Sequence, residues 1–427
     1  MKYTYCFLFT VAVLLLSCNA DPRSRRDIER EKANNTDVEE LNIGEQIIVS
    51  EIVSPTGNTF QPFNLKLYIE NSGSMDGYVD GGPDFKNAIH TYINEIKIRD
   101  LTQNVSLNFI NSEIIEKGSD VQTFFASLNS SATFRKSGGI RKSTDISFVI
   151  QKVLDNCDKN DVGIIVSDFI FSPGKGRDAS QYLVEQQINI KGYFAEYLKK
   201  NPQCAVMFIQ LAANFKGTFY NREDAKTPLN TERPYYMLIA GSKTALKAIR
   251  TNVSESLIDA RNIYTAEKTF STPDYAIKMG TGNFARSRSN PKHAIANAKK
   301  GRDNNMTFDV DANLSTTLLD DSYLYDADNY ELSDKAFTLT VAKASSNQYG
   351  YTHTLKLSCP NVKKTTLAIK LLKKSPQWIR DFDDPEGLDI NTAINKTYGL
   401  KTIIGGISSA FALGSDYYTE LLIDINK

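Results

Sequence analysis

The run Val162–Val166 constrains the fold more than any other segment, because it is almost continuous in β-branched residues. A strand without polar alternation is typical of the centre of a parallel sheet with both faces covered by helices. Helical spacing of apolar residues occurs on either side of it, at Phe85–Ile96, Asp145–Leu154 and Gln181–Lys200. This alternation predicts an α/β fold with a doubly wound, mostly parallel sheet.

Four further strands are expected in the same part of the chain, at Asn64–Ile69, Val105–Ile110, Ala205–Leu211 and Tyr235–Ala240. The polar segment Asn214–Pro234 separates the last two and is longer than an ordinary connection, so we interpret it as a functional or loose loop. A helix over Ser242–Thr251, with Ser242 as its N-cap, is expected to close this part.

Past about Glu255 the helical spacing fades and short alternating stretches follow, which favours a β-rich, sandwich-like second domain over residues 256–427. An apolar stretch at Leu400–Leu413 is the exception and is expected to be helical. Two domains also agree with the length of the chain, which exceeds what one hydrophobic core usually supports.

Side chains with hydroxyl and carboxylate oxygens follow the predicted strands. Glu70, Ser72 and Ser74 come at the end of the first strand, Thr144 precedes a predicted helix, and Asp168 follows the central strand. Open α/β sheets bind ligands at the carboxyl ends of their strands. Hard cations prefer such oxygens as ligands.

In their order and local setting these pieces resemble the metal-ion-dependent adhesion site (MIDAS) of the von Willebrand factor type A (VWA) domain, over residues 61–255. In that family the first motif reads D-x-S-x-S, a threonine follows from a second loop, and an aspartate ends a later buried strand. The resemblance implies a VWA-like fold that holds Mg²⁺ or another divalent cation through Glu70, Ser72, Ser74, Thr144 and Asp168. Glu70 is one methylene longer than the aspartate of the pattern.

The N-terminus has the features of an export signal. The apolar stretch Cys6–Leu16 is too short for a comfortable membrane span, and the residues up to Cys18 resemble a bacterial lipoprotein cleavage site. We therefore expect a signal peptide over residues 1–17, lipidation of Cys18 and a polar, lipid-anchored tether over residues 18–60. An ordinary signal peptide cut near Ala20 is the alternative. Both interpretations predict an exported protein, and the first predicts one anchored to a bacterial membrane.

Charge and cysteine content exclude several classes of protein. Lys and Arg together number 50, as do Asp and Glu, so the basic excess expected of a nucleic-acid-binding surface is absent from the sequence. Cys157, Cys204 and Cys359 are widely spaced, which favours buried free thiols, with a single disulfide bond as the alternative.

Catalytic motifs are also missing from the sequence. Its 3 histidines do not occur in an H-E-x-x-H pattern, and neither a G-x-S-x-G nucleophile motif nor a Walker-type phosphate loop is present. We therefore expect a protein that is not an enzyme.

Three functional hypotheses follow. The first is a cell-envelope lipoprotein that acts as a protein-binding module in adhesion or assembly, through a divalent cation that accepts an acidic side chain of the partner. The second is a structural envelope component with a vestigial metal site. The third is a metal-dependent hydrolase, for which the sequence offers no nucleophile or base.

Overall fold

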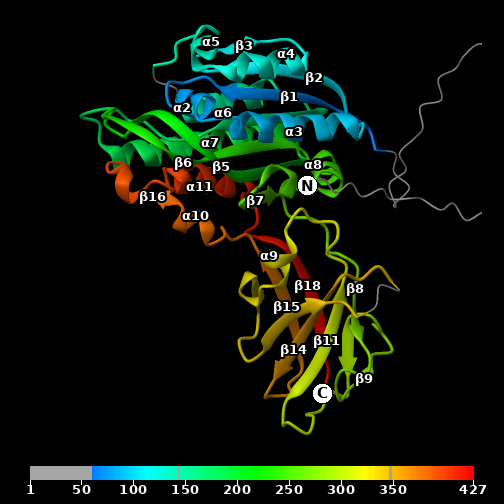
Figure 1. Ribbon diagram of the computed structural model, residues 1–427. Helices are drawn as coiled ribbons and strands as arrows, with labels where there is room; N and C mark the ends of the chain where they lie inside the picture. Colours follow the sequence, from blue (N-terminus) through cyan, green and yellow to red (C-terminus); the bar gives the residue numbers. More distant parts are fainter. Residues whose placement is uncertain (1–59, 143–144, 346–348) are drawn as a thin grey trace, which may run out of the picture. The chain divides into compact units, whose positions relative to one another are not determined.

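A seven-stranded sheet is the largest sheet of the protein (Figure 1). The computed structural model describes residues 60–142, 145–345 and 349–427. The predicted signal peptide, Cys18, the tether up to residue 59 and Thr144 lie outside these ranges. The sheet has the order β3-β2-β1-β4-β6-β5-β7. Its strands are β1 (Phe63–Glu70), β2 (Thr102–Ile110), β3 (Ile114–Glu116), β4 (Asp161–Ser167), β5 (Cys204–Tyr220), β6 (Lys226–Ser242) and β7 (Asn262–Glu267).

The strand directions are mixed, so the expectation of a mostly parallel sheet was wrong. The parallel pairs of this sheet are β1–β2 and β1–β4, whereas the pairs β2–β3, β4–β6, β5–β6 and β5–β7 are antiparallel. The reason lies in the connections. A parallel neighbour needs a long crossover, but after β5 the chain returns through a short turn as β6, and a hairpin is necessarily antiparallel.

The polar segment Asn214–Pro234 forms the outer half of this hairpin and is not a loop. The β5–β6 ladder continues from the pair Cys204–Ser242 to the pair Tyr220–Lys226. Backbone hydrogen bonds hold such a ribbon together whatever its side chains are. The outer residues of β6 alternate between partly buried and exposed positions, and in the outer half of β5 Phe215 and Phe219 are buried. The polar composition of this segment therefore led to the prediction of a loop where the chain forms a strand pair that extends beyond the rest of the sheet.

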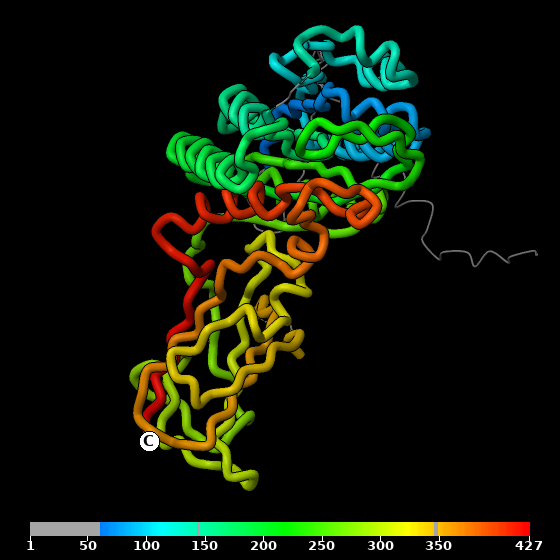
Figure 2. Tube along the Cα trace, turned by 90° about the vertical axis from the view of Figure 1, so that its left-hand side faces the viewer, coloured from blue at the N-terminus to red at the C-terminus, as the bar shows by residue number. Residues whose placement is uncertain are grey.

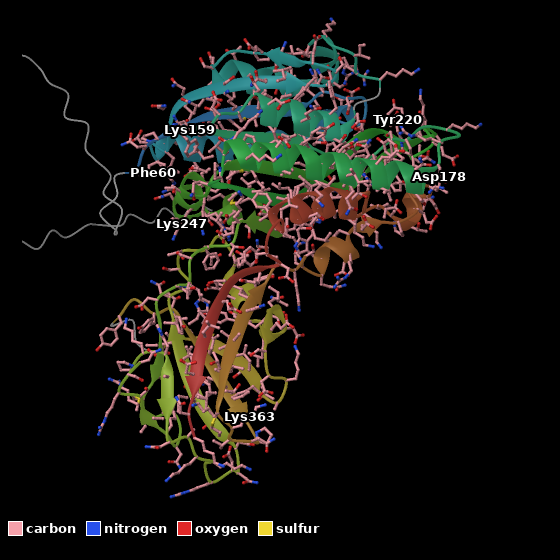
Figure 3. All side chains as sticks on the ribbon, turned by 180° about the vertical axis from the view of Figure 1, so that it is seen from behind. Phe60, Lys159, Asp178, Tyr220, Lys247 and Lys363 are labelled. Atoms are coloured by element: carbon pink, nitrogen blue, oxygen red, sulfur yellow. The ribbon has the colours of Figure 1, made fainter. Side chains whose placement is uncertain are left out.

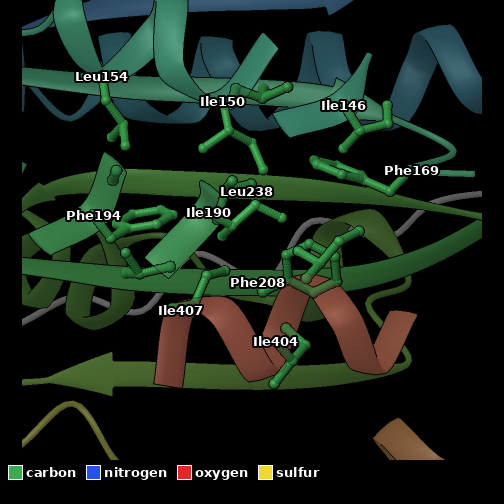
Figure 4. Packing of buried hydrophobic residues seen from close by; sticks show 14 of the residues in the cluster. Ile146, Ile150, Leu154, Phe169, Ile190, Phe194, Phe208, Leu238, Ile404 and Ile407 are labelled. Atoms are coloured by element: carbon green, nitrogen blue, oxygen red, sulfur yellow. The ribbon is translucent and has the colours of Figure 1, made fainter. Parts of the chain in front are cut away.

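Helices cover both faces of the sheet. The helices of this region are α2 (Asp76–Asp80), α3 (Asp84–Ile98), α4 (Val121–Ala126), α5 (Ser131–Arg135), α6 (Ile146–Asp155), α7 (Ala179–Lys200) and α8 (Lys243–Asn252). Ser242 caps α8 as predicted, because its hydroxyl accepts a hydrogen bond from the Ala245 N–H at 3.2 Å. The apolar residues of α6 and α7 pack onto Phe208 and Leu238 of the hairpin, while α3 lies on the opposite face (Figures 1 and 4).

Two elements from beyond residue 255, where we placed the start of the β-rich domain, complete this α/β region. The strand β7 forms the edge of the sheet beside β5. The predicted helix at Leu400–Leu413 exists as α11 (Leu400–Phe411) and packs against α7 (Figure 2). Ile404 and Ile407 of α11 belong to the same hydrophobic cluster as α6 and α7 (Figure 4).

Two smaller sheets enclose a separate hydrophobic cluster. One has five strands in the order β12-β15-β18-β10-β9, and the other has four in the order β13-β14-β11-β8. Side chains from both, such as Phe308 and Leu355 from one and Ile369 and Ile423 from the other, form the cluster. The strands are β8 (Tyr275–Lys278), β9 (Ala285–Arg286), β10 (Ala294–Ala296), β11 (Met306–Ala312), β12 (Tyr330–Leu332), β13 (Thr338–Lys343), β14 (His353–Cys359), β15 (Thr365–Leu372) and β18 (Tyr417–Ile425). The remaining α-helices and strands of the described residues are α9 (Asp321–Tyr325), α10 (Trp378–Asp381), β16 (Asp383–Asp384) and β17 (Thr397–Tyr398).

Adjacent glycines of α11 set its distance from α7 and provide a matched test of this packing. A Cβ on Gly406 would lie 2.7 Å from Cγ2 of Ile190 and 3.0 Å from the Gln187 carbonyl oxygen, whereas a Cβ on Gly405 would meet only the end of the Gln187 side chain, at 3.0 Å. We expect Gly406→Ala to lower the free energy of unfolding by about 1–3 kcal/mol through overpacking.

Gly405→Ala is the control. It should be neutral or stabilise the chain by up to about 1 kcal/mol, because alanine is the better helix former. Urea unfolding of both variants measures the difference, and equal stabilities would mean that α11 does not pack closely on α7.

Candidate functional site

The parallel pairing of β1 and β4 brings the ends of two predicted motifs together. Ile69 lies opposite Val166 in this register, so the residues that follow both strands emerge at the same edge of the sheet. The hydroxyl oxygens of Ser72 and Ser74 are 2.9 Å apart. The Ser74 hydroxyl in turn donates a hydrogen bond to the Asp168 carboxylate. Three of the five predicted site residues therefore form one connected group.

Glu70, the last residue of β1, has a partner beside this group. Its side chain is buried, and its carboxylate accepts a hydrogen bond from the hydroxyl of Ser167, the residue before Asp168. The Ser167 oxygen also accepts a hydrogen bond from the Phe169 N–H at 2.7 Å. The fifth predicted residue, Thr144, lies outside the described residues, and Asp145 after it caps α6 through the Ser147 and Phe148 N–H groups.

Burial dominates the electrostatics of Asp168. The side chain is 2% exposed, and this desolvation raises the pKa of its carboxyl group above the usual value. The Ser74 hydroxyl, the Ile170 N–H and the positive charge of Arg233 act in the opposite direction. Arg233 is itself only 1% exposed and donates to the Ile394 carbonyl oxygen at 3.0 Å.

Two arginines that the sequence reasoning missed hold the Ser-x-Ser loop from the side. The Arg141 guanidinium lies 2.5 Å from the Asp76 carboxylate, and it donates to the Ser72 carbonyl oxygen at 2.8 Å and to the Asn71 side-chain oxygen at 2.5 Å. Arg135 contacts the second Asp76 oxygen at 2.7 Å. The available signal was Arg141 itself, which stands three residues before Thr144 in the second predicted motif.

The outer end of the β5–β6 hairpin approaches the same loop. A Cβ on Gly73 would lie 3.7 Å from the hydroxyl oxygen of Tyr220, the last residue of β5 (Figure 3). Gly217 of the hairpin comes close enough to α2 that a Cβ on it would lie 2.7 Å from the Gly77 Cα. The hairpin therefore packs against both the loop and the helix that follows it.

The donor group fits a small hard cation in its chemistry and its spacing. Oxygens at neighbouring corners of an Mg²⁺ octahedron are about 3.0 Å apart when each metal–oxygen bond is about 2.1 Å. The Ser72–Ser74 separation of 2.9 Å is close to this value, although it is also the ordinary length of the hydrogen bond that the two hydroxyls form with each other. Within the described ranges no group of three or more His, Cys, Asp and Glu residues could hold a metal.

The other sequence expectations have mixed outcomes. Cys157, Cys204 and Cys359 are free and buried, as predicted. Asp84 is the first residue of α3, and Pro83 occupies the N-cap position. Asp76 is the partner of two arginines.

Comparison of the chain with protein-family models, with curated proteins and with solved structures gives no match. Among the helices of the described residues, none combines the length and the apolar character needed to cross a bilayer.

Asp168 predicts a pH-dependent stability. The pKa of its carboxyl group is higher in the folded chain than in the unfolded chain. The folded chain therefore loses stability as the pH rises from the unfolded pKa through the folded pKa, and below the unfolded pKa there is no loss. With a chelator present, we expect Asp168→Asn to melt at a higher temperature than the unmodified chain at pH 7, and the difference to shrink as the pH approaches about 4. Thermal unfolding across this range measures it. A difference that stays constant with pH would contradict the assigned cause.

Proposed function

We propose that the chain is a cell-envelope lipoprotein with a VWA-like region that binds a protein partner through a divalent cation. The observation that carries the proposal is the convergence of Ser72, Ser74 and Asp168 from two strand ends into one hydrogen-bonded group. These are three of the residues that the MIDAS resemblance specifies, and they come from segments nearly a hundred positions apart in the sequence. Membrane anchoring through Cys18 rests on the sequence of the export signal alone.

The strand arrangement supports the proposal further. The core order β2-β1-β4 is parallel, with the short β3 added antiparallel at the edge. In a sheet of this kind the carboxyl ends of the central strands are the usual position for a ligand. The two serines and Asp168 lie at that position.

Each residue would have a distinct part in holding Mg²⁺ or a similar cation. Ser72 and Ser74 would supply neutral oxygens, and Asp168 would supply the negative charge, with Thr144 and Glu70 as the further members that the resemblance implies. A site with few negative ligands leaves a bound cation electrophilic, so it accepts a carboxylate from outside. An acidic side chain of the partner protein would be that group.

The vestigial alternative also has a specific observation in its favour. Arg141 already places a positive charge on the loop, where its guanidinium contacts Asp76 and the Ser72 carbonyl oxygen. A fixed guanidinium can stabilise the loop in place of a metal ion, because it neutralises a carboxylate and donates hydrogen bonds to backbone oxygens. The loop of a purely structural envelope component would need no more than this.

Thermal unfolding with and without cations distinguishes the two. For the soluble chain that begins after Cys18, we expect Mg²⁺ or Mn²⁺ at 100 times its dissociation constant to stabilise the fold by about 2.7 kcal/mol relative to chelator. The double variant Ser72→Ala, Ser74→Ala should lose this stabilisation.

A matched control pair exists in the same chain. Ser287 and Ser289 form another Ser-x-Ser pair, with hydroxyl oxygens 3.2 Å apart, and their double alanine variant should respond to cations like the unmodified chain. Equal unfolding temperatures with cation and with chelator in the unmodified chain would refute the cation-dependent proposal and favour the structural alternative.

The contribution of Arg141 is tested separately. Arg141→Met leaves the buried Asn71 side chain without this donor, so we expect the free energy of unfolding to fall by about 1–3 kcal/mol. Arg135→Met is the control, because the Arg135 side chain is 54% exposed and such ion pairs contribute at most about 1 kcal/mol. Urea unfolding compares them, and equal losses would show that Arg141 is only a surface charge.

A further inference from the structure

A cavity of about 450 Å³ lies away from the Ser-x-Ser loop, beside α8 and the first residues of β14. Its wall includes Lys247 and Arg250 of α8, the segment from Leu314 to Tyr325, and the strand ends that carry Lys343 and His353. Lys247 is labelled in Figure 3. The volume falls within the range of about 300–1,000 Å³ that is usual for small-molecule sites.

His353 is the unusual member of this wall. Its side chain is 3% exposed, and its Nε2 has no hydrogen-bond partner among the described residues. A buried polar atom is nearly always paired in a folded protein, so an unpaired one requires an explanation. Among the residues with such atoms in the described part of the chain, His353 is the one that lines this cavity. The ring lies 4.9 Å from that of Tyr325, which fixes its plane.

The contacts of the other ring nitrogen indicate which proton His353 carries. Burial lowers the pKa of the imidazole, so the ring is neutral at pH 7 and only one nitrogen bears a proton. Nδ1 lies 2.8 Å from the Thr352 hydroxyl oxygen, whereas the Ala312 carbonyl oxygen, the other acceptor for the Thr352 proton, is 3.4 Å away. We infer from the shorter contact that the hydroxyl proton lies toward Nδ1, which would leave Nε2–H as an unused donor.

The charges of the wall favour an anion. Arg250 is balanced by Glu255 and Asp320, but no carboxylate lies within ion-pair distance of Lys247 or Lys343 in the described part of the chain. Asp321 is the acidic side chain of the wall. With Glu255 and Asp320 included, three cations and three acids balance in and around the wall, and Lys247 and Lys343 are the two cations that lack a carboxylate partner for themselves.

Lys343 and His353 also share one position on the sheet. They are cross-strand partners at the end of the β13–β14 pair, and directly opposed residues project from the same face. Lys247 approaches from α8, where its amino group donates to the Ser315 carbonyl oxygen at 2.5 Å. Lys343 and His353 thus project from one face of the sheet, and Lys247 lies on the helix that completes the wall. The charged side chain that acts on His353 is Asp321, which raises the pKa of the ring against the effect of burial.

We propose that this cavity binds a small hydroxylated organic anion, whose carboxylate or phosphate group is held by Lys247, Lys343 and the Nε2–H of His353. The hydroxyl groups of Thr251, Tyr325 and Tyr351 in the wall are partners for the hydroxylated body of the ligand. The site is independent of the cation site, because it shares none of its residues.

Histidine NMR on the full-length chain tests the proposal directly. The sequence has 3 histidines, so labelling their rings with ¹⁵N gives few signals, and His353→Gln identifies that of His353. The probes are glucuronate for a carboxylate, glucose 6-phosphate for a phosphate ester, inorganic phosphate, and glucose as the neutral control. We expect one or more of the anions, but not glucose, to shift the His353 Nε2–H signal while the His90 and His293 signals stay unchanged.

Substitutions then separate binding from folding. His353→Asn keeps a donor or acceptor near the Nδ1 position but removes Nε2, and Lys247→Met removes one of the cations. Each single variant should bind the active probe about tenfold or more weakly, since a hydrogen bond to a charged group contributes that much affinity. Lys191→Met on the exposed part of α7 is the matched control and should bind like the unmodified chain. His353→Gln restores a polar group near Nε2 and should recover part of the affinity.

The outcomes are distinct. A preference for glucuronate identifies a sugar acid as the ligand class, a preference for glucose 6-phosphate identifies a phosphate ester, and binding of inorganic phosphate alone supports the anion site. The proposal is overturned if no anion shifts the His353 signal at millimolar concentration, or if folded Lys247→Met and His353→Asn bind the probe as tightly as the unmodified chain. Failure of the cation test at Ser72 and Ser74 has no bearing on either result.

Discussion

The parallel register between β1 and β4 is the constraint on which the candidate site depends. Parallel strands end at the same edge, so the pairing of Ile69 with Val166 by itself delivers the Ser-x-Ser loop and Asp168 to one place. A shift of one residue in this register would turn Glu70 away from Ser167 and move Asp168 away from Ser74. The hydroxyl contacts of the site are therefore consequences of backbone pairing, and the loop needs no long excursion to reach its partner.

The surroundings of the loop come from other parts of the chain. Arg141 enters from the segment before α6, Tyr220 comes from the far end of the β5–β6 hairpin, and Asp168 interacts with Arg233 on the returning strand. Three separate connections thus converge on one short loop. Such enclosure reduces the freedom of the loop and keeps its oxygens in a fixed arrangement, which a cation of strict geometry requires.

The sequence allowed prediction of the elements whose side chains repeat with a clear period. The strands β1 and β4 and the helices α3, α6, α7 and α8 follow from apolar spacing, and the proximity of Ser72, Ser74 and Asp168 follows from where those strands end. The outer half of the β5–β6 hairpin could not be predicted in this way, since backbone pairing leaves no apolar pattern and the buried residues Phe215 and Phe219 are isolated among polar ones. The roles of Arg141 and Arg233 depend on tertiary contacts and could not be predicted from the sequence either. No periodicity indicated that His353 would be buried without a partner for Nε2.

The position of α11 affects how the chain acquires its fold. This helix comes from the last thirty or so residues, yet Leu400, Ile403 and Ile407 belong to the cluster that covers the hairpin and α7. A chain emerging from the ribosome therefore cannot finish the α/β region until the β-rich sheets have nearly all been made, and contacts over so long a sequence separation slow folding. During that interval the apolar sides of α7 and β7 remain exposed to water and to other chains. The same dependence means that a fragment ending at residue 255 lacks both the edge strand and the covering helix. The α/β region therefore needs residues from both halves of the sequence to complete its fold.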